Sequence, residues 1–201
     1  MMTIPVTIVF EDELSEYVLT RMLSFFGNKY SISQSYPANG FGYIKSNIKG
    51  FNNASKFSPF IILTDLDNID CPIKLIEDWL PKKVHEQYLI FRIAVREVES
   101  WLLADIEGFS LFSGVSQANF PILPELENDP KSTLMGIIKK SKKRKIKEDI
   151  LPTNDNAKVG PNYNTRLGDF VCYHWNINNA KNRSLSLKSA MDCLQRFEYN
   201  Y

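Results

Sequence analysis

The stretch FSPFIILTDLDNID, residues 57–70, ends an apolar run on two aspartates. Phe60 to Leu63 are four consecutive apolar residues, a pattern typical of a strand that is buried on both faces of a parallel sheet. Asp65 and Asp67 follow two positions apart, so in extended backbone their side chains would point to the same face. Two like charges on one face repel unless a cation or a proton lies between them. The stretch therefore predicts a buried strand with an acidic site at its carboxyl end.

Strand-like and helix-like segments alternate over the first half of the chain. The strand-like runs are Val6–Phe10, Tyr30–Tyr36, Phe60–Thr64 and Gln87–Val95. Residues at helical spacing span 14–25, 44–51, 73–80 and 98–105. This alternation predicts an α/β fold, a Rossmann-like parallel sheet flanked by helices.

The strand pattern fades in the second half of the chain. The motif NDPK is typical of a helix start, with Asp129 as the cap and Pro130 at the first helical position. Two further segments fit helices, Arg166–Trp175 and Leu185–Phe197. We therefore expect a core over residues 1–106 and a mostly helical C-terminal extension over residues 107–201, packed on the core as one compact domain.

Composition excludes several classes of protein. The chain has 201 residues, of which 44% are hydrophobic and 12% aromatic, and this fits a packed globular core. Three scattered cysteines and two histidines do not have the spacing of a disulfide framework or a structural zinc site. No apolar run approaches the ~20 residues of a membrane span, and MMTIPVTIVFEDE lacks the pattern of a signal peptide. We expect a cytoplasmic protein with no membrane partner.

Acidic residues follow three of the predicted strands. Glu11 follows the first, Asp65 and Asp67 follow the third, and Glu97 and Glu99 follow the fourth. Sites in parallel sheets lie beyond the carboxyl ends of the strands, so we expect these acids to share one edge. The plain alternative is that they cap and start the next helices. Caps alone do not require an Asp pair together with two further acidic groups.

Two families share parts of this pattern. VFEDE with a later strand that ends in aspartate resembles the response-regulator receiver, but the gap from Asp12 to Asp65 is long and the lysine–proline turn of that family is missing. TDLD resembles the nucleophile motif of haloacid-dehalogenase phosphatases, although that motif follows the first strand and ends in glycine and a hydroxyl residue.

A third resemblance covers nearly the whole chain, from about residue 8 to about residue 175. The motifs that carry it are FEDELSE, GFGYIK, TDLDNIDCP, REVESWLLAD, NDPK and GPNYNTRL. Together they resemble a family of small bacterial Toprim-like proteins, related to nucleases of the overcoming-lysogenization-defect type. The resemblance implies a Toprim fold in which Glu11 is an acid/base or a metal ligand, and Asp65 and Asp67 hold magnesium. Asp12 stands where many Toprim proteins have glycine, which leaves open whether Glu11 or Asp12 is the central acid.

The chemistry of these acids predicts a metal-dependent reaction. Carboxylates are hard ligands that suit Mg²⁺ or Mn²⁺, and Glu97 or Glu99 would complete a second metal for displacement at a phosphodiester. Arg96 lies beside these acids in the sequence, where it would either hold a phosphate or neutralise the cluster.

The run KKSKKRKIK, residues 139–147, has seven basic residues in nine. It is either a solvated helix end or a nucleic-acid contact that uses Lys142, Lys143, Arg144 and Lys145. We favour a nuclease and expect DNA rather than RNA as its substrate. The resemblance adds an ATPase partner in phage defence, and any ATP use would belong to that partner because GxxxxGK[ST] is absent. The alternative is a non-catalytic module that binds nucleic acid or the ATPase.

Overall fold

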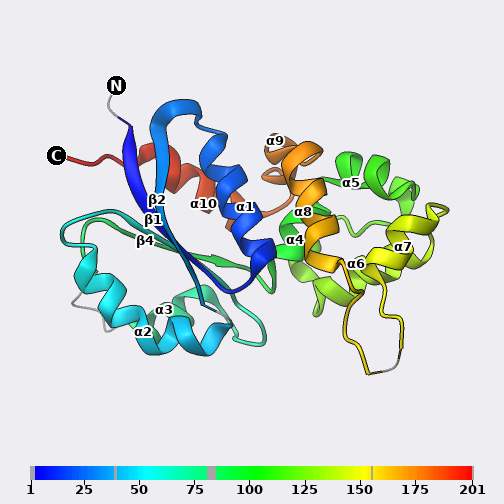
Figure 1. Cartoon of the computed structure of the whole chain (residues 1–201), viewed down its shortest axis with the longest axis horizontal. Helices are drawn as coiled ribbons and strands as arrows, with labels where there is room; N and C mark the ends of the chain where they lie inside the picture. The colour runs from blue at the N-terminus through cyan, green and yellow to red at the C-terminus, as the bar shows by residue number, and fades with distance from the viewer. Residues whose placement is uncertain (1–2, 39, 81–84, 155, 201) are drawn as a thin grey trace. The chain divides into compact units, whose positions relative to one another are not determined.

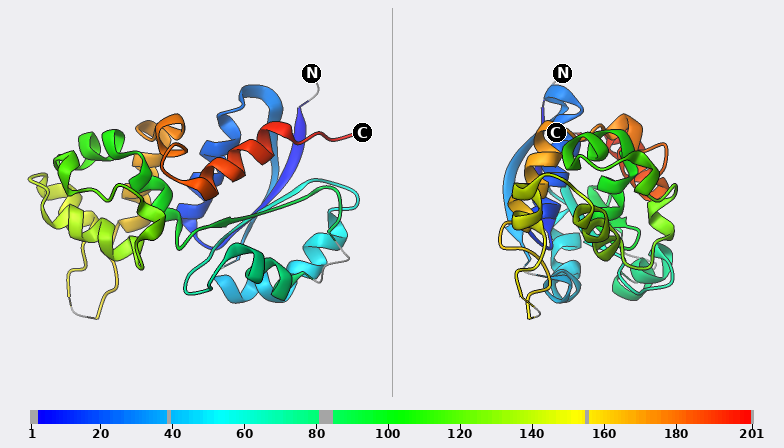
Figure 2. Two further views of the ribbon diagram at one scale, coloured as in Figure 1. Left: turned by 180° about the vertical axis from the view of Figure 1, so that it is seen from behind. Right: turned by 90° about the vertical axis from the view of Figure 1, so that its right-hand side faces the viewer.

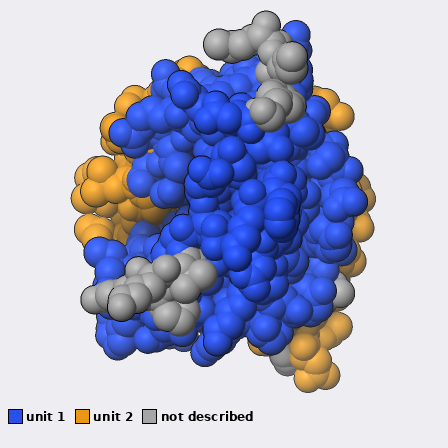
Figure 3. Space-filling view, turned by 90° about the vertical axis from the view of Figure 1, so that its left-hand side faces the viewer, with its two compact units in different colours: residues 1–95, 189–201 blue, residues 96–188 orange. Residues whose placement is uncertain are grey.

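The computed structural model describes residues 3–38, 40–80, 85–154 and 156–200. The chain divides into two compact units, which Figure 3 colours separately. Unit 1 comprises residues 1–95 and 189–201, and unit 2 comprises residues 96–188.

Unit 1 contains a four-stranded, all-parallel sheet with the strand order β2-β1-β3-β4. The strands are β1 (Ile4–Phe10), β2 (Tyr30–Pro37), β3 (Phe60–Asp65) and β4 (Leu89–Ala94). The helices of this unit are α1 (Glu13–Ser24), η1 (Gly27–Lys29), α2 (Phe41–Ala54), α3 (Pro72–Trp79) and the part of α10 (Leu185–Arg196) from residue 189 onward. The predicted α/β class with a parallel sheet flanked by helices is confirmed.

Helices cover both faces of this sheet, with α2 and α3 on one side and α1 and α10 on the other (Figures 1 and 2). Val9 and Ile62 point toward α2 and α3, where they join a core cluster with Ile48 and Trp79. Burial on both faces explains why FIIL in β3 has no polar interruption. In contrast, β2 is an edge strand in which all residues after Tyr30 are exposed.

Unit 2 is helical. Its elements are α4 (Val98–Ala104), α5 (Ile106–Ser113), η2 (Gln117–Asn119), η3 (Pro124–Leu126), α6 (Pro130–Lys139), α7 (Arg144–Ile150), α8 (Tyr163–Tyr173) and α9 (Ile177–Ala180). The helix predicted from NDPK is confirmed as α6, because Asp129 accepts a hydrogen bond from the Ser132 amide at 2.7 Å and Pro130 is its first residue. Trp101 and Trp175 are fully buried in the core of this unit.

The division between the units differs from the predicted boundary after residue 106. All residues of α4 are buried, and α4 packs against α6, η3 and α9, so the helical unit begins before α4. The last residues of the chain return to unit 1, where the Tyr30 hydroxyl and the Lys29 ammonium donate to the Leu194 carbonyl at the end of α10. None of the helices in the described ranges has the length and apolar character of a membrane span.

Candidate functional site

Glu11 and Asp65 lie together at the carboxyl ends of adjacent strands. Glu11 directly follows β1, and Asp65 is the last residue of β3, the strand that pairs with β1. The Glu11 carboxylate accepts a hydrogen bond from the Asp65 amide at 3.0 Å and a second one from the Thr64 hydroxyl. Both bonds end on the same oxygen, Oε1, so these two donors fix the orientation of the carboxylate. The acids that follow β1 and β3 therefore share the edge that the sequence predicted.

The surroundings of Glu11 disfavour its charged form. Burial raises the pKa of its carboxyl group above the usual range, and the negative charges of Asp67 and Asp12 raise it further. The hydrogen bonds from Thr64 and Asp65 act in the opposite direction but do not reverse the shift. A cation at this edge would relieve the repulsion and favour the ionised form.

Asp67 leaves the line of the strand. β3 ends at Asp65, and Asp67 has a φ of 49°, in the left-handed region that few residues other than glycine adopt. The Leu66 amide donates to the Ala94 carbonyl at 2.9 Å, which holds the turn against the end of β4. The two aspartates therefore do not project from one extended segment, as the sequence had suggested, because the backbone turns between them. Asp67 is exposed, and Asp65 is half-buried.

Asp12 caps the helix that follows β1. Its side chain accepts a hydrogen bond from the Ser15 amide at 2.9 Å, and Glu13 and Glu16 occupy the first turn of α1. This is the arrangement expected of an N-cap residue. The acid that contacts Asp65 is Glu11, whereas Asp12 has a structural role at α1.

Glu97 and Glu99, the predicted site acids of unit 2, both contact Lys131. Glu99 is 1% exposed, and its Oε1 accepts a hydrogen bond from the Tyr163 hydroxyl at 2.8 Å and lies 3.3 Å from the Lys131 ammonium nitrogen. Glu97 Oε2 accepts a hydrogen bond from the Lys131 amide at 2.9 Å, at the start of α6. Burial and the charge of Glu99 raise the pKa of Glu97 to about 7. Arg96, two residues beyond β4, is half-buried and has a φ of 63°.

Much of the basic run forms contacts inside unit 2. The Lys143 ammonium donates to the carbonyls of Leu111 and Phe112 at 2.9 and 2.8 Å. Arg144 pairs with Glu148 at 2.7 Å, and Lys145 pairs with Asp149 at 3.1 Å. Lys142 is exposed. The contacts of Lys143, Arg144 and Lys145 fit the interpretation of the run as a solvated helix end. Of the four predicted nucleic-acid contacts, this leaves Lys142 as the candidate phosphate contact.

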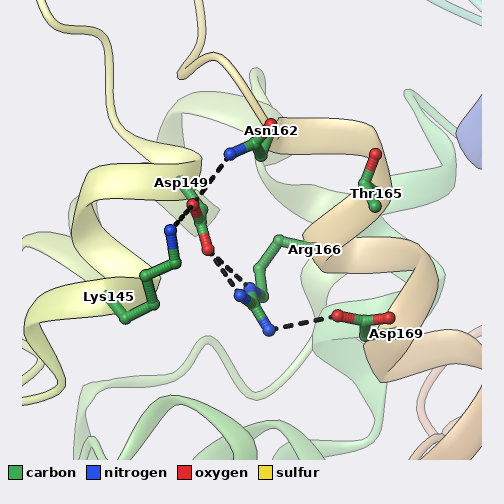
Figure 4. Close-up of a pocket in the computed structure, with 6 residues that line it drawn as sticks. All are labelled: Lys145, Asp149, Asn162, Thr165, Arg166 and Asp169. Carbon is green, nitrogen blue, oxygen red and sulfur yellow. Dashed lines mark hydrogen bonds and ion pairs between the residues drawn. The ribbon is translucent and has the colours of Figure 1, made fainter.

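A polar pocket of about 150 Å³ lies beside α7 and α8, and it was not predicted from the sequence (Figure 4). Asp149 lies at its base with a side chain that is 2% exposed, and Arg166 donates to one of its oxygens through Nε and Nη2 at 2.9 and 2.6 Å. Asn162 and Lys145 bind the other oxygen, and Arg166 also contacts Asp169. Four donors saturate Asp149, and they lower its pKa to about 2. This network ties α7 to α8 and leaves no acceptor of Asp149 for a ligand.

The acids of unit 1 fit a hard divalent cation by their chemistry. Carboxylate oxygens are the ligands that Mg²⁺ prefers. Burial is the main cause of the raised pKa of Glu11, and the negative charges of Asp67 and Asp12 add to it. Within the described ranges, no group of three or more His, Cys, Asp or Glu side chains has the geometry of a formed metal site. Comparison of the chain with protein-family models, with curated proteins and with solved structures finds no match.

Proposed function

We propose that this chain is a Toprim-type phosphoryl-transfer enzyme that depends on Mg²⁺ or Mn²⁺. We propose that it acts as a nuclease and that its substrate is DNA rather than RNA. The observation that supports the proposal is the hydrogen bond between Glu11 and the Asp65 amide at the carboxyl ends of two adjacent parallel strands. A glutamate after the first strand and an Asp-x-Asp after a neighbouring strand is the order that the Toprim resemblance implies. The edge of a parallel sheet where strands end is also the usual place for a site in this fold class.

In this proposal each acid of unit 1 has a separate role. Asp65 and Asp67 hold the metal, which when bound stabilises the charge that develops on the phosphate oxygens. Glu11 accepts the proton of the attacking water, a role that its raised pKa suits. Hydrolysis forms one P–O bond to the water oxygen and breaks the P–O bond to the leaving ribose or deoxyribose oxygen, which takes up a proton. The contribution of Glu97 and Glu99 to a second metal remains a sequence prediction.

Cationic side chains would supply affinity for the nucleic-acid backbone. Lys142 is exposed and is the proposed phosphate contact from the basic run, because its neighbours Lys143, Arg144 and Lys145 have intramolecular partners. Arg96 keeps its two interpretations, as a phosphate ligand or as a counter-charge. Such contacts hold the backbone without reading the bases, so we expect cleavage without strong sequence preference. The proposed setting is phage defence beside an ATPase.

The decisive test is metal-dependent cleavage by the full chain, alone and with candidate ATPase partners. Single- and double-stranded DNA and RNA would be incubated in EDTA, Mg²⁺ and Mn²⁺. Asp67→Asn is the sharpest variant, because asparagine tolerates a left-handed φ and removes only the charge. We expect Asp67→Asn to abolish cleavage and keep substrate binding. Lys142→Gln should weaken binding and, for duplex DNA, reduce the slope of the logarithm of the binding constant against the logarithm of the salt concentration by up to ~0.9.

Two results would overturn the proposal. Cleavage by Asp67→Asn at the wild-type rate would assign the activity to a contaminant or to another site. A wild-type protein that binds nucleic acid or the ATPase but cuts nothing with either metal would instead support the non-catalytic module.

A further inference from the structure

A long stretch of unit 1 carries only positive charge. From residue 17 to residue 64 the chain has five lysine or arginine residues and no aspartate or glutamate, although 23 of its 201 residues are acidic. The stretch forms most of α1, all of β2 and α2, and β3 as far as Thr64. A surface built from it has no carboxylates of its own to offset the cations. Such a surface attracts anionic partners.

Two lysines of this stretch are on the exposed side of α2. Lys45 and Lys49 are four residues apart, so they lie on the same face of the helix, about 6 Å apart along its axis. Both are exposed, and neither forms an ion pair with another residue in the described ranges. Lys56, which follows the helix, pairs instead with Glu86 at 3.6 Å. The fold therefore leaves the charges of Lys45 and Lys49 available to a partner.

The rest of this helix face is polar and open. Gly42, Ser46 and Asn53 are exposed on the same side of α2, whereas Ile44 and Ile48 are buried in the core cluster on the opposite side. A Cβ added at Gly42 would meet no atom within 4 Å. A polar, positive and open face has the character of a surface that contacts phosphates, not of one that buries apolar groups.

The helix that carries these lysines begins at the edge where Glu11 and Asp65 lie. β2 ends beside β1, and the Gly40 amide, which follows β2, donates to the Glu11 carbonyl at 3.0 Å. α2 starts at the next residue, so Lys45 is about 6 Å and Lys49 about 12 Å along the helix from its start. All of these residues belong to unit 1. A polyanion that follows α2 would reach the acid edge, where the carboxylates alone would repel it.

We infer that the face of α2 with Lys45 and Lys49 binds the phosphate backbone of the DNA substrate. Duplex DNA carries one charge per ~1.7 Å of its axis, so the two lysines can contact different phosphates at the same time. Such contacts hold the backbone without reading the bases. They also offset the repulsion between the substrate and the acids of the same unit. The inference takes its ligand from the proposed function, but it concerns binding and not the cutting step.

The test is DNA binding by the full chain, measured by fluorescence anisotropy with labelled single- and double-stranded DNA in EDTA and in Ca²⁺. Lys45→Gln and Lys49→Gln should each raise Kd roughly 5- to 10-fold at ~0.1 M salt. For duplex DNA, each should reduce the slope of the logarithm of the binding constant against the logarithm of the salt concentration by up to ~0.9. Lys45→Arg/Lys49→Arg keeps both charges and should bind as wild type does.

The matched control is Lys74→Gln. Lys74 is an exposed lysine of the neighbouring helix α3, and it pairs with Asp70 at 2.8 Å. Its loss should leave Kd and the salt slope nearly unchanged, and all of these variants should keep the wild-type Tm because the substituted side chains are exposed.

The outcomes separate this inference from the proposed function. Wild-type affinity and salt slope in Lys45→Gln/Lys49→Gln, or an equal loss in Lys74→Gln, would overturn the inference. A wild type that binds no DNA in either buffer would overturn it too, and would point to an acidic protein as the partner of this face. A wild type that binds DNA through these lysines but cuts nothing in Mg²⁺ or Mn²⁺ would remove the proposed nuclease and support the α2 surface.

Discussion

The Glu11→Gln variant should be at least as stable as wild type without divalent metal and less stable than wild type when metal is added. Burial raises the folded-state pKa of Glu11 above its ordinary value of 4.5. The fold therefore prefers the protonated group, and its favourable contribution is present at low pH and is lost as the pH rises through the folded pKa. Glutamine stays neutral, and its Oε1 can accept the same hydrogen bonds from Thr64 and Asp65. Without divalent metal at pH 7, Glu11→Gln should be at least as stable as wild type.

The order should reverse in Mg²⁺ or Mn²⁺. Metal that binds the folded state alone adds about 2.7 kcal/mol to the free energy of unfolding when its free concentration is 100 times Kd. For a chain of 201 residues this is a rise in Tm of about 5–10 °C. Glu11→Gln loses one charged group of the site, so its gain in Tm at the same metal concentration should be much smaller.

The assay is thermal and urea unfolding, followed by circular dichroism in EDTA and in each metal. The matched control is Glu13→Gln, because Glu13 is exposed and lies in the first turn of α1, where its side chain accepts from the Tyr17 hydroxyl. Glu13→Gln should respond to metal as wild type does. A wild type that neither metal stabilises would refute the metal site. A Glu11→Gln variant that is clearly less stable than wild type in EDTA would refute the cost assigned to the charged form of the half-buried Glu11.

Two further predictions concern the network around Asp149. Asp149→Asn should lower the free energy of unfolding by about 3 kcal/mol at pH 7, because it leaves the half-buried Arg166 with one ionic partner fewer. The control Glu148→Gln removes an exposed ion pair and should leave the stability nearly unchanged. The pKa of Asp149 in the folded state is about 2, below the ordinary 3.8, so the stability that Asp149 adds is present above pH 4 and is lost between pH 4 and 2. In urea titrations, the difference in free energy of unfolding between wild type and Asp149→Asn should become smaller over that range. A constant difference would contradict the lowered pKa of Asp149. Gly160→Ala should cost about 1–3 kcal/mol in the same titrations, because its Cβ would lie 2.4 Å from the Asp149 carbonyl oxygen, and a loss below 0.5 kcal/mol would contradict that contact.

The sequence was most informative where local pattern and fold agree. The uninterrupted FIIL run predicted the buried strand β3, and the parallel topology brought Glu11 to Asp65, since the carboxyl ends of parallel strands share an edge. The part played by Thr64 could have been read from TDLD, because a hydroxyl one residue before the aspartate lies at that edge too. The turn at Asp67 could not have been predicted from the sequence, because aspartate occurs in both extended and left-handed backbone.

The basic run shows why the rest was out of reach. In sequence, Lys143 and Lys142 are equivalent members of KKSKKRKIK. Only the fold brings the end of α5, with the Leu111 and Phe112 carbonyls, to Lys143, since helices end in carbonyls that have no partner within the helix. The spacing of Lys145 and Asp149 predicts a helical pair, but nothing in it indicates that Arg166, seventeen residues on, completes the network. Contacts between distant segments therefore decide which charges in a cluster stay available to a partner.

The backbone of the loops after β3 and β4 bears on the function that we propose. Asp67 and Arg96 each have a left-handed φ two residues beyond the end of a strand. That conformation costs a side chain such as that of Arg96 roughly 1–2 kcal/mol, and glycine would adopt it without the penalty. If only the turn mattered, glycine would serve better at both positions. The chain instead keeps a carboxylate at one and a guanidinium at the other, which are the groups that bind a divalent cation and a phosphate. The loop after β4 thus keeps a guanidinium at a cost in stability, whereas aspartate tolerates the same backbone at Asp67.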